Sequence, residues 1–233
     1  MGEIKVKDKE VAVPGQVLAT GMDFLPSYKT YRLGEEIRAQ GLGIVKVEGK
    51  VLKIISLSGR YMPKRNDTII AQVIDVLMSG WRFDINSAYS AMLPLKDASS
   101  RYIERGSDLT KIYALGDYVS CMVTNVTSQK LVDISMKGPS LRKLTGGRII
   151  EVNTHKVPRI IGKQGSMVSL IKESTGCRIV VGQNGIIWID GEPEKEVIAV
   201  NAIMKIEEEA HQAGLTDRIK KYLDEEIAKL GKK

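Results

Sequence analysis

The alternation of apolar and polar residues divides the chain into three regions. In the first, runs such as VAVPGQVLA and GIVKVEGKVLKIISL alternate with a period of two, and glycines such as Gly41 and Gly49 interrupt them. A period of two places successive side chains on opposite faces of a strand, and glycine permits the turns between strands. The pattern predicts a small β domain over residues 1–62.

The second region, residues 63–145, contains further strand-like runs. They are DTIIAQVIDVLM, WRFDINSAYSAMLPL, DYVSCMVTNV and KLVDISMK, separated by turn signals and one polar stretch. Four or five strands in about 75 residues predict a five-stranded barrel of the OB type. Trp81, Phe83 and Ile85 share one face of an alternating strand, so barrel core is favoured for them over stacking on a ligand.

The third region, residues 146–233, changes its period. RIIEVNT, CRIVVG and IIWIDG are strand-like, whereas SMVSLIKEST predicts a short helix and EPEKEVIAVNAIMKIEEEAHQA a long one with Pro193 in its first turn. TDRIKKYLDEEIAKL predicts a last helix after an N-cap-like Thr216. Its apolar stripe can pack on the body or on a partner, and the body is favoured. The three regions together predict a multidomain α+β chain.

Charge narrows the class of partner. The formal net charge is +7 and the pI is about 9.3, which favours a polyanion. The positive charge is concentrated between residues 136 and 165, where Glu151 is the single acid. The basic residues of this window are Lys137, Arg142, Lys143, Arg148, Lys156, Arg159 and Lys163. A solvated linker face is the alternative explanation.

Several classes of protein are disfavoured. Cys121 and Cys177 are far apart and form no CxxC pair, so we expect two buried thiols in a reducing cytoplasm rather than a zinc site or a disulfide framework. No apolar run is long enough to span a membrane, and the charged N-terminus lacks a secretory signal. Two histidines, without an HExxH pattern or a nucleophile arrangement, predict no catalytic residue, no metal ligand and no cofactor.

A glycine motif supplies the most specific signal. Gly162–Gly165 lies within IIGKQGSMVSLIKESTGCRIVV, which resembles the signature of KH domains and implies a type I KH fold across residues 147–213. Two glycines permit a tight turn that a nucleic-acid backbone can approach, and the following helix offers free amides to phosphate. We expect bases to lie on an apolar groove floored by residues such as Ile179. The residues predicted to contact RNA here are Arg159, Ile160, Ile161, Gly162, Lys163, Gln164 and Gly165. The alternative is a KH fold that serves only as a packing module.

The middle region resembles the S-one-type RNA-binding barrel across residues 66–137. SGWRFDINSAYSAMLPLKDAS follows the second and third strands of that family. The family's stacking aromatics and histidine are replaced at Ser79, Arg82 and Pro94, which argues against aromatic stacking. Arg82 can stack through its guanidinium instead. The residues expected to hold phosphates are Lys96, Arg101, Arg105, Lys137, Arg142 and Lys143.

The whole chain resembles one family in domain order. VAVPGQVLATG and GRYMPKRNDTIIAQV are similar to the archaeal exosome RNA-binding cap subunit, whose pattern is PG-x-x-L and then Y-x-P-x-x-G-D, with Asn66 here in place of the glycine. The resemblance implies a non-catalytic subunit that binds single-stranded RNA. It also implies a homotrimeric or mixed cap on a hexameric phosphorolytic ring, docked through residues 1–62. A sister cap subunit carries a zinc ribbon, which the absence of CxxC excludes for this chain.

A regulatory factor is the competing function. Transcription or translation factors also combine such a barrel with KH units, although usually with two of them. Bacterial polynucleotide phosphorylase has the two domains in the reverse order after large catalytic domains that are missing here. Association with a ribonuclease ring, rather than with a polymerase or a ribosome, would discriminate between these functions.

Overall fold

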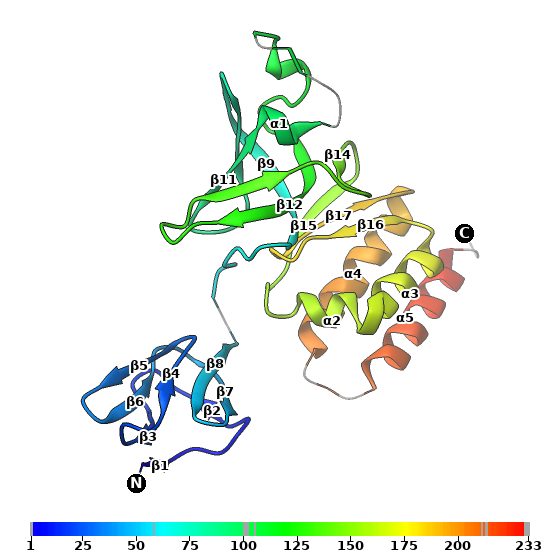
Figure 1. Ribbon diagram of the computed structural model, residues 1–233. Helices are drawn as coiled ribbons and strands as arrows, with labels where there is room; N and C mark the ends of the chain where they lie inside the picture. Colours follow the sequence, from blue (N-terminus) through cyan, green and yellow to red (C-terminus); the bar gives the residue numbers. More distant parts are fainter. Residues whose placement is uncertain are drawn as a thin grey trace. The chain divides into compact units, whose positions relative to one another are not determined.

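The computed structural model describes residues 2–57, 59–99, 103–104, 106–210, 212 and 214–230. Contacts divide the chain into two compact units, Met1–Gly59 and Arg60–Lys233. The predicted barrel and the predicted KH fold share the second unit, so their mutual contacts are part of one body (Figure 1). The predicted domain boundaries at residues 62 and 145 remain predictions.

The first unit is built from short strands around a small core, and all of its strand pairs are antiparallel except the parallel pair β4–β8. One sheet has the order β1-β3-β6-β5 and the other the order β2-β7-β8-β4. The strands are β1 (Glu3–Ile4), β2 (Val11–Ala12), β3 (Val17–Thr20), β4 (Leu25–Pro26), β5 (Thr30–Leu33), β6 (Glu36–Ala39), β7 (Gly43–Glu48) and β8 (Val51–Ser56). Leu18, Ile37, Leu52 and Ile54 are fully buried between them, as the alternating pattern predicts.

The second unit begins with a closed barrel. β9 pairs with β10 and β12, β10 with β11, β11 with β13, and β13 returns to β12, so the ladder closes on itself. The elements are β9 (Thr68–Leu77), β10 (Gly80–Asp84), β11 (Ser90–Pro94), α1 (Leu95–Ala98), the 3-10 turn η1 (Leu109–Lys111), β12 (Tyr118–Val126), β13 (Val132–Ser135) and β14 (Arg142–Leu144). The five strands β9 to β13 confirm the predicted barrel.

The barrel core confirms the prediction for the aromatic strand. Trp81, Phe83 and Ile85 have no exposed surface. The indole Nε1 of Trp81 donates a hydrogen bond to the carbonyl oxygen of Tyr113 at 3.0 Å, and the two rings meet edge to face. A buried indole requires such a partner, and this one is a backbone group of the barrel. These aromatic residues therefore stabilise the fold and are not available to stack on RNA bases.

The Y-x-P-x-x-G-D motif, which corresponds to Tyr61–Asp67 here, has a structural role. Asn66 adopts φ +70°, a left-handed conformation that asparagine tolerates better than most residues, which explains how it can replace the glycine. Tyr61 lies in the barrel core, and its hydroxyl donates to Asp67 Oδ2 at 2.6 Å. Burial, and then this bond to a carboxylate, raise the pKa of Tyr61. The segment thus fixes the start of the barrel.

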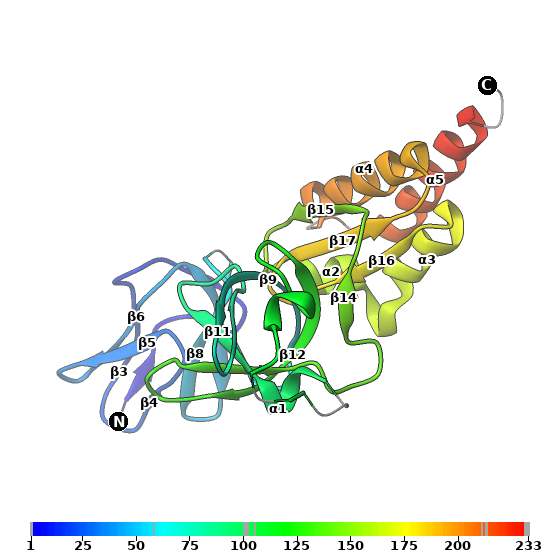
Figure 2. The ribbon, with the colours of Figure 1, turned by 90° about the horizontal axis from the view of Figure 1, so that it is seen from above.

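The last region has the β-α-α-β-β-α order of a type I KH fold, followed by one more helix. The elements are β15 (Arg148–Glu151), α2 (Val157–Ile161), the 3-10 turn η2 (Lys163–Gly165), α3 (Ser166–Thr175), β16 (Arg178–Val181), β17 (Ile186–Asp190), α4 (Pro193–Glu209) and α5 (Leu215–Leu230). The sheet has the antiparallel order β15-β17-β16. The helices cover one face of this sheet and the barrel side lies toward the other (Figures 1 and 2).

The two C-terminal helices follow the sequence pattern with one correction. α4 starts at Pro193 with Glu194 and Glu196 in its first turn, as expected. Ile219 and Leu223 are fully buried in the core shared with α3 and α4, so the stripe of α5 packs on the body. Thr216, however, is inside α5, because the helix already begins at Leu215. The predicted N-cap at Thr216 is therefore wrong.

Candidate nucleic-acid interface

The turn between α2 and α3 contains the predicted glycine loop. Gly162 and Gly165 have φ +76° and +81°, and Gln164 between them has φ +53°. A Cβ at Gly162 would lie 2.7 Å from the backbone nitrogen of Met167, so only glycine fits there. A Cβ at Gly165 would meet no atom within 4 Å. The space in front of the loop is therefore open to a ligand.

The loop carries positive charge and lies at the N-terminus of a helix. Lys163, Gln164 and Arg159 are exposed. α3 has ten residues, and no side chain caps its first turn. The first amides of a helix have no partner within the helix and carry a partial positive charge. Together with Lys163 they form a site suited to one or two phosphate groups.

The apolar floor differs in part from the prediction. Ile160 has no exposed surface and Ile179 is only 3% exposed, because both pack in the core beneath the loop. Ile160 therefore supports the loop and does not offer a surface to bases, which corrects the expectation for this residue. Partly buried side chains remain at Ile161, Val168 and Val181. These three, from α2, α3 and β16, are the apolar surface that a base could reach.

The described residues of the barrel that are predicted to contact RNA lie on separate elements. Arg82 is exposed on β10, on the face opposite Trp81 and Phe83, and Lys96 is exposed on α1. α1 lies away from α2 and α3 in both ribbon views (Figures 1 and 2). Arg101 and Arg105 lie outside the described residues. The alternation along β10 predicts an outward Arg82, but it does not indicate any link to the glycine loop.

The basic residues of the window between the two domains lie in different environments. Lys137 is exposed, and Arg142 lies over the indole ring of Trp188, 5.6 Å from its centre. Lys143 forms an ion pair with Asp117, which neutralises its charge. Lys143 is therefore a weaker phosphate contact than its position in the sequence suggests.

Sequence reasoning missed three exposed groups. Arg178 lies 5.9 Å from the centre of the same Trp188 ring, and Lys172 is exposed near the end of α3. Tyr89 keeps 36% of its surface exposed between β10 and β11. Arg178 and Lys172 were missed because they lie outside the window of concentrated charge, although the alternation of β16 already separates Arg178 from the buried Ile179.

The described residues offer no arrangement typical of catalysis or metal binding. Among them, no group of three or more His, Cys, Asp and Glu side chains lies close enough to hold a metal ion. Cys121 and Cys177 are free and buried, as expected, and burial raises the pKa of the Cys121 thiol, which makes it unreactive. No helix in the described part of the chain is both long and apolar enough to cross a membrane.

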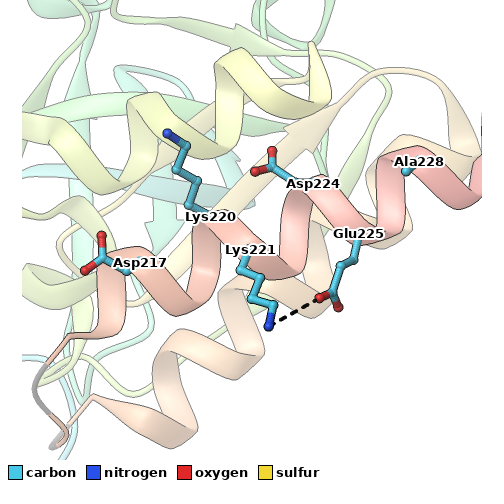
Figure 3. Close-up of a pocket in the computed structure, with 6 residues that line it drawn as sticks. All are labelled: Asp217, Lys220, Lys221, Asp224, Glu225 and Ala228. Carbon is cyan, nitrogen blue, oxygen red and sulfur yellow. Dashed lines mark ion pairs between the residues drawn. The ribbon is translucent and has the colours of Figure 1, made fainter.

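A shallow hollow on α5 does not change this conclusion. Its lining consists of Asp217, Lys220, Lys221, Asp224, Glu225 and Ala228. All are exposed, and Lys221 pairs with Glu225 one turn later at 3.9 Å (Figure 3). Alternating charges of this kind are typical of a solvated helix face. The hollow therefore supplies exposed positions on α5 for reference changes of charge.

The fold and the loop define a KH-domain protein whose KH unit follows an OB-type barrel. A profile of the KH domain family matches residues 147–205. A solved structure of a protein assigned as an exosome complex RNA-binding protein superposes with a TM-score of 0.67 and 34% identity, covering 73% of this chain and 98% of that one.

Three curated relatives extend the match beyond the KH domain. Each is an exosome complex component Rrp4. The protein of Methanothermobacter thermautotrophicus is 40% identical over 94% of this chain and 69% of its own length. That of Pyrococcus furiosus is 39% identical over 99% and 88%, and that of Picrophilus torridus 43% identical over 85% and 86%. The chain belongs to the Rrp4 family of exosome complex components.

Proposed function

We propose that this chain is a non-catalytic subunit of an exosome-type RNA-degrading complex and that it captures single-stranded RNA. The observation that carries the proposal is the open glycine loop, with exposed Lys163 and Arg159 in front of an uncapped α3. The relatives that are named exosome complex components are similar in sequence to this chain over most of its length. Capture without chemistry fits a site that has phosphate-binding groups but no nucleophile or acid–base pair.

RNA binding by the loop would be mainly electrostatic. Phosphates would be held by the first amides of α3 and by Lys163, and a base would rest on Ile161, Val168 or Val181. Arg82 and Lys96 of the barrel, with Arg101 and Arg105, would add contacts to the same strand. Contacts to phosphate position a strand but do not read its sequence. The binding is therefore expected to tolerate many RNA sequences.

The assembly role extends the proposal to the first unit. A homotrimeric cap, or a mixed cap with the zinc-ribbon subunit, would dock residues 1–62 on the hexameric phosphorolytic ring in the cytoplasm and present RNA to its pore. The outer face of the β2-β7-β8 sheet supports docking. Val11 pairs with Ile44 and Ile44 with Ile55, so the three side chains form one row on this face. Val11 and Ile55 keep 53% and 51% of their surface exposed, as is common at protein interfaces.

The first experiment measures RNA degradation by the purified protein alone and by a mixture of this protein and the catalytic ring. The protein alone is expected to cause no phosphate-dependent shortening of labelled RNA, whereas the mixture should degrade weakly held substrates faster than the ring alone. Shortening by rigorously purified protein would refute the non-catalytic role.

The second experiment tests the partner. Tagged full-length chain should retain the ribonuclease ring, and Val11→Asp with Ile55→Asp should lose it while keeping RNA affinity. Leu33→Asp, at an exposed apolar position on β5 of the other sheet, is the matched control and should keep the ring. Retention of a polymerase or ribosome instead of the ring would favour the regulatory-factor alternative.

A further inference from the structure

A second basic hollow lies where the barrel side meets the KH sheet. It has a volume of about 370 Å³. Its lining consists of Ser140, Arg142, Lys172, Cys177, Arg178, Ile179 and Val180. Arg142 comes from β14, which pairs with barrel strand β12, whereas Lys172 and Arg178 come from α3 and β16 of the KH fold. The hollow therefore exists only when the two domains are in contact.

Trp188 holds the two arginines of the hollow in place. Val180 pairs with Trp188 and Arg178 with Asp190 across β16 and β17, so Arg178 and Trp188 share a face of the sheet. The guanidinium carbons of Arg142 and Arg178 lie 5.6 Å and 5.9 Å from the centre of the indole ring. Trp188 as a whole residue is 3% exposed, and its Nε1 donates to the carbonyl oxygen of Gly146 at 2.8 Å. Cation–π contact with a fixed ring orders both arginines before a ligand arrives.

Two of the three basic side chains of the hollow have no acidic partner in the described part of the chain. Arg178 forms an ion pair with Asp190, but 67% of its side chain remains exposed. Arg142 and Lys172 are exposed and form no ion pair with any residue in the described part of the chain. Ordered arginines with free donors are suited to phosphate, because a guanidinium can donate two parallel hydrogen bonds to its oxygens.

We propose that this hollow is a second phosphate-binding site for the same RNA strand that lies on the glycine loop. The inference rests on the proposed function and adds a site to it. Lys172 follows Gly165 by seven residues along α3, which corresponds to about 10 Å of helix. A single strand that leaves the loop along α3 can therefore reach Lys172, Arg178 and Arg142 in turn. The ligand class is the phosphate backbone, since the hollow presents charged donors rather than an aromatic surface.

The contact between the domains makes the two sites act together. Asn184 in the turn between β16 and β17 is fully buried and bonds to Ile70 and Ile85 of the barrel side. This contact fixes the distance between the loop and Arg142. Two weak sites at a fixed distance bind one long strand more tightly than a short one, because the second contact is intramolecular.

The test measures binding of oligouridylates of 4, 8 and 16 nucleotides to the full chain by fluorescence anisotropy across a salt series. The variant Arg142→Gln/Lys172→Gln/Arg178→Gln should bind the 16-mer about tenfold more weakly, with a salt slope shallower by about 0.7 for each phosphate that the variant no longer neutralises. The loss should be smaller for the 4-mer, because it brings fewer phosphates to the two sites at once. Lys172→Glu alone alters one exposed side chain and should show the same trend if the triple variant folds poorly.

The matched control is Lys220→Gln on the solvated face of α5 (Figure 3). An unchanged affinity and salt slope for the 16-mer in folded Lys172→Glu and triple variants would overturn the second site while leaving the proposed function intact. An equal loss in Lys220→Gln would overturn it as well, because the effect would then reflect total charge. RNA binding that is absent in the wild type would instead overturn the proposed function itself.

Discussion

The KH fold contains two turns of similar length, of which one is exposed to solvent and the other is buried against the barrel. In the Gly162–Gly165 turn, Lys163 and Gln164 point into solvent and the helix amides behind them are uncapped. In the Gly182–Gly185 turn, Asn184 is fully buried against the barrel. Its Oδ1 accepts from the Ile70 amide at 3.3 Å, and its Nδ2 donates to the carbonyl oxygens of Ile70 and Ile85 at 2.7 and 2.9 Å.

The comparison shows how one fold separates binding from assembly. The hydrogen-bonding groups of the second turn are satisfied by the barrel side, so this turn contributes to stability and offers little to a ligand. The side chains of Lys163 and Gln164 in the first turn are exposed instead, so they remain available to a ligand. Substitutions of exposed side chains in the first turn should therefore affect RNA affinity, whereas substitutions of buried side chains in the second turn should affect the free energy of unfolding.

The largest effect is expected for Asn184→Ala. It leaves the Ile70 amide and two buried carbonyl oxygens without their partner, which should reduce the free energy of unfolding by about 3 kcal/mol and the midpoint of thermal unfolding by about 10 °C. Differential scanning calorimetry of the full chain measures both. Gln183→Ala is the matched control, because its exposed side chain accepts only one bond, from the Thr68 amide at 3.1 Å. Equal losses of stability in the two variants would show that the buried contacts of Asn184 contribute no more than the exposed one of Gln183.

A second test compares the two glycines of the binding loop. Gly162→Ala places a Cβ 2.7 Å from the Met167 nitrogen at φ +76°, so we expect it to destabilise the fold by about 2 kcal/mol and to distort the loop. Gly165→Ala meets no atom within 4 Å and should cost about 1 kcal/mol, from its left-handed conformation alone. Urea denaturation measures the difference. A larger loss for Gly165→Ala would show that the loop is packed differently.

The charge of the loop should affect RNA binding and not stability. Lys163→Asp with Gln164→Asp should weaken binding about tenfold across RNA sequences and make the salt slope shallower, because roughly one or two phosphates would no longer be neutralised. The unfolding midpoint should stay within about 2 °C of the wild type, because both side chains are exposed. A folded variant with unchanged affinity would identify the KH fold as a packing module and the barrel as the RNA site.

Arg142 and Lys143 provide a smaller contrast within two adjacent residues. Arg142→Ala should weaken binding of long RNA about threefold, because this guanidinium has no acidic partner in the described part of the chain. Lys143→Ala should change the affinity by less than about twofold, since Asp117 already neutralises the ammonium group. Anisotropy titrations of the two single variants check the order. A stronger effect of Lys143→Ala would place the RNA on the opposite side of β14.

The smallest effect concerns an exposed turn of the first unit. Hydrogen bonds from Lys46 and Lys53 lower the pKa of Glu48 to about 2. A depressed pKa means that the interaction is fully present above pH 4.5 and is lost as the pH falls toward 2. Glu48→Gln should therefore unfold slightly earlier than the wild type near pH 6, with a difference that shrinks below pH 4.5. A difference that grows on acidification would contradict the assignment.

Local sequence was sufficient for the order of elements and for much of the core. The period of two buries Trp81 and Phe83 inside the barrel, and the glycine spacing together with the apolar helix pattern predicts the KH order. These features depend on residues a few positions apart, so a single sequence contains them. The glycine loop could be predicted for the same reason, since its turn requires glycine at Gly162 whatever lies elsewhere.

Only the tertiary structure decided which polar and apolar groups remain available. Lys143 is neutralised by Asp117, Ile160 is covered by the helices above it, and Asn184 joins a KH turn to Ile70, more than a hundred residues away. The arginines of the second hollow meet on Trp188 from β14 and β16. Exposure and charge pairing arise from contacts between residues that are distant along the chain, and no local period contains that information.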